Sequence, residues 1–154
     1  MIKKFIIKHK GFISIIIISL SLLFFYYGKV ILNANDYNFT FRGDGIKNYY
    51  TYAYFIKYDK ISTSFTGMNY PYGEHFLYTD CHPLLSTFLK FFPFFTDKSV
   101  GILNLLMIFS IFFTTIILYL IFQHLKIKPL LNIFATIGIT ALAPQIFRMT
   151  GHYA

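Results

Sequence analysis

The stretch from Gly11 to Gly28 reads GFISIIIISLSLLFFYYG and contains no charged residue. After Lys29, the apolar character continues through Val30 to Leu32. At about 1.5 Å per residue, a helix over 11–32 would be roughly 33 Å long, which is enough to cross a hydrocarbon layer of about 30 Å. We therefore predict a membrane-spanning helix over residues 11–32, preceded by a basic segment over 1–10.

A cleaved secretory signal is the alternative for this stretch, because Lys3, Lys4, Lys8 and Lys10 precede it. The apolar part of such a signal is about 7–15 residues long, which is shorter than the stretch here. The tripeptide Leu32-Asn33-Ala34 also has a large residue where a cleavage site has a small one. The sequence therefore favours an uncleaved span.

Two further apolar runs follow late in the chain. Residues 99–125 contain only three strongly polar side chains, and residues 130–147 contain no charged residue. The turn between them, 126–129, carries Lys126 and Lys128 and ends at Pro129, a residue that suits the first turn of a helix. Such a short turn predicts an antiparallel pair of spans. The predicted fold class is an all-α integral membrane protein with three transmembrane helices.

The composition supports this class. The chain is 56% hydrophobic and only 13% charged, whereas soluble proteins have about 25% charged residues. The net charge of +8 comes from basic residues that flank the apolar runs, so no nucleic-acid partner is expected. Cys81 is the one cysteine, which excludes a disulfide within the chain.

The lysines predict an orientation. Residues 1–10 contain four lysines and no acid, and the turn adds two more, whereas residues 33–98 contain six basic residues and six acids. Positive charge near the ends of spans stays on the cytoplasmic side. We expect a multi-pass protein of the cell (inner) membrane, in contact with membrane lipid. Its amino terminus would be cytoplasmic, and residues 33–98 and 148–154 would be outside.

The long outer loop, 33–98, is too rich in aromatic residues to be a bare connector. Two segments have helical patterns: 45–58, with Ile46, Tyr49, Ala53 and Ile56 on one stripe, and 83–92, with an apolar face beside Lys90. Neither is long enough to span. We predict short helices that lie in the membrane interface, where Tyr and Phe sit at headgroup depth.

Asp44 lies between Gly43 and Gly45, just before the first of these helices. One interpretation is an N-cap, in which the carboxylate accepts a hydrogen bond from the backbone N–H of Ile46 or Lys47. The other is a functional carboxylate near the membrane surface, with bare backbone around it that lets a substrate approach closely. The two interpretations are compatible.

Glu74, His75, Asp80 and His82 place four ionisable groups within nine residues. Carboxylate and imidazole together suit Mn, Zn or Fe, so a divalent metal is one hypothesis, although the spacing matches no specific ligand motif. An exposed polar turn is the other interpretation, and His82, which precedes Pro83, could be an N-cap. The cofactor remains undetermined by the sequence.

Arg148 and His152 follow the third predicted span. An arginine that reaches the interface from a span end is one interpretation. The predicted topology gives the other, since it puts these residues on the same membrane face as the acids and histidines of the outer loop. An arginine there suits a phosphate group.

The overall layout resembles the amino-terminal part of GT-C class membrane glycosyltransferases that use polyprenyl-phosphate donors. The matching features are a first span with a cytoplasmic end, the acid in Arg42-Gly43-Asp44-Gly45, a long first outer loop with juxtamembrane helices, the stretch Met68 to His75, and the segment Arg148 to His152. The resemblance implies transfer of a sugar from a polyprenyl-phosphate donor to an acceptor at the outer face.

Carried onto this chain, the resemblance implies that Asp44, rather than Asp36, is the general base or helps to bind a metal. The substrate-binding residues would be Arg42, Glu74, His75, Asp80, His82, Arg148 and His152. Many relatives have paired acids at this point and many more spans. We therefore expect a fragment of a larger enzyme, inactive without further transmembrane helices. The alternative is a non-catalytic small membrane protein, either an assembly factor or part of a flippase or transporter.

Overall fold

The computed structural model describes residues 10–61 and 63–149. Three helical segments are long and apolar enough to cross a membrane. They are α2 (Lys10–Leu32), α5 (Ser99–His124) with the turn before it, and a third segment made of α6 (Pro129–Ala141) and α7 (Pro144–Arg148). The first two predicted spans are thus confirmed as helices with nearly the predicted ends, and the third is helical on both sides of a break.

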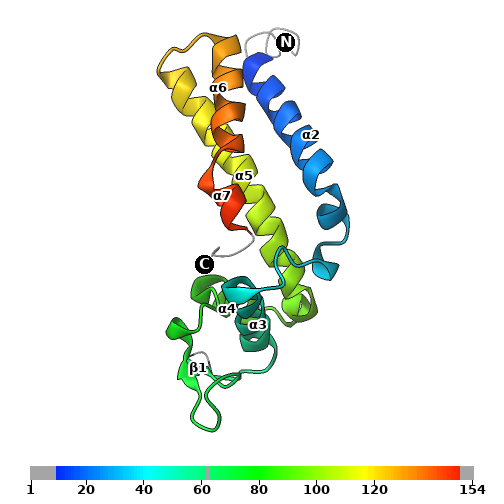
Figure 1. Ribbon diagram of the computed structural model, residues 1–154, viewed down its shortest axis with the longest axis vertical. Helices are drawn as coiled ribbons and strands as arrows, with labels where there is room; N and C mark the ends of the chain where they lie inside the picture. The colour runs from blue at the N-terminus through cyan, green and yellow to red at the C-terminus, as the bar shows by residue number, and fades with distance from the viewer. Residues whose placement is uncertain (1–9, 62, 150–154) are drawn as a thin grey trace.

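The residues between α2 and α5 form a small lobe at one end of the three-helix bundle (Figure 1). In chain order its elements are η1 (Ala34–Asp36), α3 (Gly43–Lys57), β1 (Ser64–Phe65), β2 (Glu74–His75), η2 (Phe76–Tyr78), α4 (Pro83–Lys90) and η3 (Pro93–Lys98). The two strands pair antiparallel, with Ser64 opposite His75 and Phe65 opposite Glu74.

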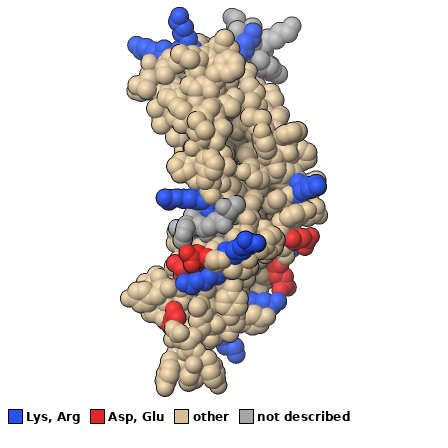
Figure 2. All heavy atoms as spheres, viewed as in Figure 1, with Lys and Arg blue, Asp and Glu red and all other residues tan. Residues whose placement is uncertain are grey.

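In the bundle, α5 lies against both α2 and α6 (Figure 1). The start of α2 and the turn between α5 and α6 are at the end of the bundle opposite the lobe. Among the described residues, the charged side chains that Figure 2 shows at that end are basic, whereas basic and acidic side chains are mixed around the lobe. The excess of lysines in 1–10 and 126–129 over 33–98, seen in the sequence, is therefore also a difference between the two ends of the folded protein.

The third span is not the continuous helix over 130–147 that we predicted. Helix α6 ends at Ala141, and α7 begins at Pro144 after Ala143, whose φ of −64° and ψ of 134° are extended. Proline has no N–H to donate, its ring clashes with the carbonyl four residues earlier, and it pushes the preceding residue out of the helical region. Pro144 therefore breaks the span.

The side chain of Gln145 holds α7 against α5 after this break. Its amide nitrogen donates a hydrogen bond to the Ser110 hydroxyl, and its amide oxygen accepts one from the Thr114 hydroxyl at 3.3 Å. One turn into α6, Asn132 similarly donates to the carbonyl of Tyr119 at 3.2 Å. Polar side chains at helix interfaces have this role in membranes, where the hydrophobic effect does not drive helices together.

Asn104 of α5 joins the lobe to the bundle. It is completely buried, and its Nδ2 donates to the carbonyl of Ala34 at 2.7 Å and to that of Tyr37 at 2.6 Å. Its Oδ1 accepts a hydrogen bond from the hydroxyl of Tyr49 in α3. The Asn104 amide thus attaches two parts of the lobe to the same point of α5: the segment that follows α2, and helix α3.

The two short helices predicted in the long loop are present as α3 and α4, but only part of the predicted stripe of α3 is buried. Tyr49 and Ile56 of this stripe are buried together with Tyr52 and Phe55, whereas Ile46 is exposed. The hydrophobic core of the lobe is continuous with that of the bundle, because Tyr49 and Tyr52 share one cluster with residues of α2 and α5. Helix α3 therefore packs against α4 and α5. The pattern of apolar residues within 45–58 could not show which elements it packs against.

We predict that Asn104→Leu lowers the free energy of unfolding by at least about 2 kcal/mol, because two backbone carbonyls and the Tyr49 hydroxyl lose their buried partner. Unfolding in mixed micelles, followed by circular dichroism, measures this change. Asn33→Leu is the matched control, because that exposed side chain makes a single 3.5 Å contact to its own helix. Equal stabilities of the two variants would contradict the role of Asn104.

Candidate functional site

The predicted site residues lie on the lobe and at the end of α7. The end of α7 reaches the lobe, because Met149 is buried in the same cluster as Tyr49 and Tyr52 of α3. Arg148 precedes Met149 and is exposed at this junction. The residue that follows the third span and the helix that carries Asp44 therefore share one hydrophobic core. The predicted residue His152 lies outside the described residues.

Asp44 is not the N-cap of α3. The helix begins at Gly43, so that Arg42 takes the N-cap position and Asp44 lies in the first turn. Gly43 has a φ of 55°, a left-handed conformation that glycine adopts without strain. A carboxylate in the first turn stabilises a helix through the helix dipole. The side chain of Asp44 is exposed, as a group that meets a substrate must be.

Arg42 is fixed through its backbone, and its side chain is exposed. The Thr40 hydroxyl donates to the carbonyl of Arg42 at 3.2 Å and accepts from its N–H at 3.4 Å. This local turn leads the chain into α3. Arg42 and Asp44 are thus a basic and an acidic side chain, two residues apart, at the start of one helix.

Asp80 lies beside the beginning of α3, where it forms an ion pair with Lys47 at 3.1 Å. Lys47 is three residues after Asp44, and residues at this spacing lie on the same side of a helix. The pair is about half exposed, so it is accessible to solvent and contributes little to stability. Our sequence reasoning placed Asp80 among the site residues but missed Lys47; the signal was its spacing from Asp44.

His82 occupies the predicted N-cap position of α4, with a left-handed backbone and without a hydrogen bond from its side chain to the helix. Its ring meets the ring of Tyr52 edge-on, with centroids 5.8 Å apart. Burial lowers the pKa of His82, and the nearby charge of Asp80 partly opposes this effect. Burial therefore favours the neutral imidazole over its protonated form.

Glu74 and His75 have structural roles in the hairpin. Glu74 accepts a hydrogen bond from the Asn69 amide, and Nδ1 of His75 accepts one from the N–H of Leu77 at 3.4 Å, which caps η2. The hairpin packs through Phe65 and its neighbours on the later turns of α3, about 15 Å along the helix from Asp44. These two residues are therefore not brought to Asp44.

The predicted metal-binding set is not assembled. Within residues 10–61 and 63–149, no three His, Cys, Asp or Glu side chains come together in a way that could hold a metal ion. Asp80 faces Lys47, His82 faces Tyr52, and Glu74 and His75 belong to the hairpin. The polar-turn interpretation of this segment therefore fits the described residues better than the metal interpretation.

The outer part of the lobe contains two charged residues with buried charged atoms, Lys90 and Asp59. The Lys90 ammonium lies 3.7 Å from the centroid of the Phe55 ring, and burial lowers its pKa, while the charge of Asp59 opposes this shift. Asp59 is almost completely buried and accepts hydrogen bonds from the N–H and the hydroxyl of Thr66. Cys81 is fully buried nearby and donates to the carbonyl of Phe76. These groups are internal, and we assign them a structural role.

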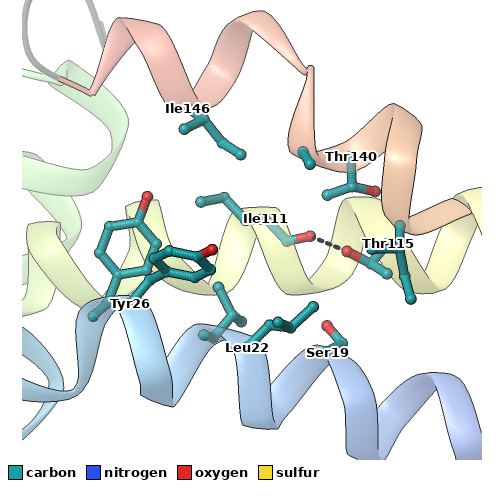
Figure 3. A pocket seen from close by; sticks show the side chains of 11 residues that line it. Ser19, Leu22, Tyr26, Ile111, Thr115, Thr140 and Ile146 are labelled. Atoms are coloured by element: carbon teal, nitrogen blue, oxygen red, sulfur yellow. Dashed lines mark hydrogen bonds between the residues drawn. The ribbon is translucent and has the colours of Figure 1, made fainter.

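A cleft lies between α2 and the broken third span, with α5 as its floor (Figure 3). Its volume is about 270 Å³. The lining residues are Ser19, Leu22, Leu23, Tyr26, Tyr27, Ile111, Thr115, Ile137, Thr140, Ala141 and Ile146, and none of them is an acid or a base that is charged at pH 7. We call this space the α2–α7 cleft. It extends from the middle of the bundle toward the lobe, because Ile146 and Tyr27 also pack against the core that holds α3.

Comparison with known proteins gives a family without an assigned activity. No curated protein and no solved structure matches the chain. A family model described as a domain of unknown function, DUF6311, matches residues 16–154, which include all three candidate spans almost entirely, and the whole lobe. The chain therefore belongs to the DUF6311 family.

Proposed function

We propose that this chain is part of a membrane glycosyltransferase that moves a sugar from a polyprenyl-phosphate donor to an acceptor at the outer face of the cell membrane. The observation that carries the proposal is the shared core of Tyr49, Tyr52 and Met149. Through this core, an exposed carboxylate and exposed arginines from distant parts of the chain lie at the same end of the bundle. An exposed acid and arginine at that end suit a substrate whose headgroup is a sugar phosphate.

In this proposal, the acceptor hydroxyl oxygen forms a bond to the anomeric carbon of the donor sugar. The bond between that carbon and the phosphate oxygen breaks, and its electron pair leaves with the phosphate. Asp44 takes the proton of the attacking hydroxyl, as a positioned carboxylate can. Arg42 and Arg148 stabilise the charge that develops on the phosphate, since a guanidinium can bind two phosphate oxygens at once.

The second candidate is a non-catalytic role, for example as part of a flippase or transporter. The broken third span favours it, because discontinuous helices line the substrate sites of many transporters. However, such sites usually carry ionisable residues near the middle of the membrane. The residues that line the α2–α7 cleft supply none that are charged at pH 7, whereas the acids of the chain lie in the lobe segment. The enzymatic proposal accounts for this distribution better.

The proposal requires the lobe to be outside the cytoplasm, which cysteine labelling can test. Cys81 is unsuitable as a probe because it is fully buried. In a Cys81→Ala background, we expect Tyr72→Cys, which replaces a side chain that is 93% exposed, to react with a membrane-impermeant maleimide in intact cells. His124→Cys, at the opposite end of α5, should react only after the cells are permeabilised. The reverse pattern would overturn both the orientation and the proposed reaction.

The role of Asp44 can be tested in cells that express only the full-length protein. We expect Asp44→Asn to reduce sugar transfer at least about 100-fold, because the acceptor hydroxyl loses its base. Mass spectrometry of envelope glycans from null, wild-type and variant cells measures the transferred sugar. Membrane abundance should not change, because Asp44 is exposed.

Asp36→Asn is the matched control for this variant, since Asp36 is also an exposed acid in the first turn of a short helix. It should retain transfer. Unchanged transfer in Asp44→Asn, or an equal loss in both variants, would be incompatible with Asp44 as the base.

A further inference from the structure

Helix α4 has its polar and apolar sides reversed compared with a helix in water. Leu84, Phe88 and Phe91 are four and three residues apart, so they share one side of the helix, where they are 89%, 55% and 75% exposed. The opposite side carries Ser86, which is completely buried, and Lys90, whose ammonium nitrogen is also buried. At the surface of a water-soluble protein, the polar side of a helix faces outward instead. This reversal indicates apolar surroundings on the exposed side of α4.

Exposed aromatic side chains extend this surface beyond the end of α4. The ring of Phe92 lies 5.1 Å from that of Phe88 and 6.0 Å from that of Phe94, measured between ring centroids. Phe94 in η3 is 68% exposed, whereas the adjacent Phe95 packs against the core that the lobe shares with the bundle. The row of rings thus runs from α4 to the bundle. We call the exposed apolar side chains along it the α4 ridge: Leu84, Phe88, Phe91 and Phe94.

The ridge lies beside the start of a candidate membrane span. Two residues, Phe91 and Phe92, separate α4 from the segment Pro93–His124, which is long and apolar enough to cross a membrane. Within this segment, the 26 residues of α5 extend over about 39 Å, close to the roughly 40–45 Å of a bilayer with its headgroups. The start of α5, and η3 before it, therefore lie at headgroup level. Because η3 contacts both α4 and α5, α4 lies near this level too, whereas the β1–β2 hairpin forms the far end of the lobe (Figure 1).

Basic side chains lie at η3, next to the ridge. Lys98, the last residue of η3, is exposed, and Lys57 reaches the same segment through its ion pair with Asp97 at 3.3 Å. Lysine side chains near the end of a span extend their ammonium groups toward lipid phosphates. An apolar ridge with lysines beside it matches a lipid layer, which offers acyl chains and anionic phosphates at neighbouring depths.

We propose that the α4 ridge inserts into the membrane leaflet on the side of the lobe, at the boundary between headgroups and acyl chains, as the apolar side of an interfacial helix does. Lipid then covers the side chains that the protein alone leaves exposed, and the lobe is held against the membrane. The inference concerns α4 rather than α3, because α3 buries Tyr49, Tyr52, Phe55 and Ile56 in the protein. It goes beyond the proposed sugar transfer and holds for either candidate function.

Tryptophan fluorescence can test this position, because the chain contains no tryptophan of its own. The Phe88→Trp variant is reconstituted in nanodiscs of phosphatidylethanolamine and phosphatidylglycerol, in which part of the lipid carries bromine either near the head or near the middle of its acyl chains. We expect bromine near the head to quench most of the emission and bromine near the middle to quench less, because an interfacial helix lies only about 5–10 Å deep. Iodide in the aqueous phase should have little effect.

Phe113→Trp and Tyr72→Trp are the matched controls. Phe113 is 59% exposed near the middle of α5, so tryptophan there should respond most strongly to bromine near the middle of the acyl chains. Tyr72 is 93% exposed in the connection between β1 and β2, so tryptophan there should be quenched by iodide and by neither brominated lipid. Each of these variants exchanges one exposed aromatic ring for another, which leaves the core unchanged.

Two results for Phe88→Trp would overturn the proposal. If this variant is quenched like Tyr72→Trp, the ridge faces water. If it is shielded from both iodide and brominated lipid, a protein surface, such as that of a second copy of the chain, covers the ridge instead. Phe91→Trp should give the same pattern as Phe88→Trp, and a disagreement between the two would exclude insertion of the ridge as a unit.

Discussion

The hydrogen bonds of Asn104 are the constraint on which the arrangement of this protein depends. A primary amide in a span is costly in lipid unless its donors and acceptor are satisfied. Here the amide satisfies two carbonyls of the segment after α2 and the hydroxyl of Tyr49 in α3. The cost of burying it is offset only when three separate segments meet, so this single residue specifies how the lobe sits on the bundle.

The neighbouring contacts reinforce this junction. Asn35 donates to the carbonyl of Asp97 at 2.7 Å and accepts from the N–H of Gly101 at 3.0 Å. A Cβ at Gly101 would come within 3.1 Å of the backbone nitrogen of Asn35, which explains why the smallest residue stands there. The start of α5 is therefore tied to η1 by the Asn35 side chain as well as by the Asn104 side chain. The lobe is continuous with the bundle rather than tethered to it.

The break at Pro144 has two consequences for function. It lets α7 change direction so that Met149 reaches the core beneath α3, which brings Arg148 to the lobe. The residues on either side of the break, Ala141 and Ile146, both line the α2–α7 cleft. The course of the third span beside the lobe thus depends on a proline that a continuous helix would not tolerate.

Several features of the protein follow from local sequence alone. Composition and run length determine the spans, because a helix that crosses a membrane needs about twenty apolar residues, whatever its neighbours are. Lysine positions determine which ends lie together, and Pro83 and Pro129 determine where two helices begin. The placement of Asp44 and Arg148 at one end of the bundle also follows from the number of spans. Two spans lie between these residues, and an even number of spans returns the chain to the same end.

Only the tertiary structure decided which side chains meet. The sequence presented Asn104 as a polar interruption of a span, and the stripe through Ile46 as a membrane-facing surface. Tyr49 and Ile56 of this stripe are buried in the core, whereas Ile46 is exposed, because the tertiary partner determines which side of a helix is covered. The pairing of Asp80 with Lys47, thirty-three residues apart, and the separation of Glu74 from Asp44 likewise depend on how the lobe packs. Such contacts join residues that are far apart in the sequence, so the local spacing of residues does not predict them.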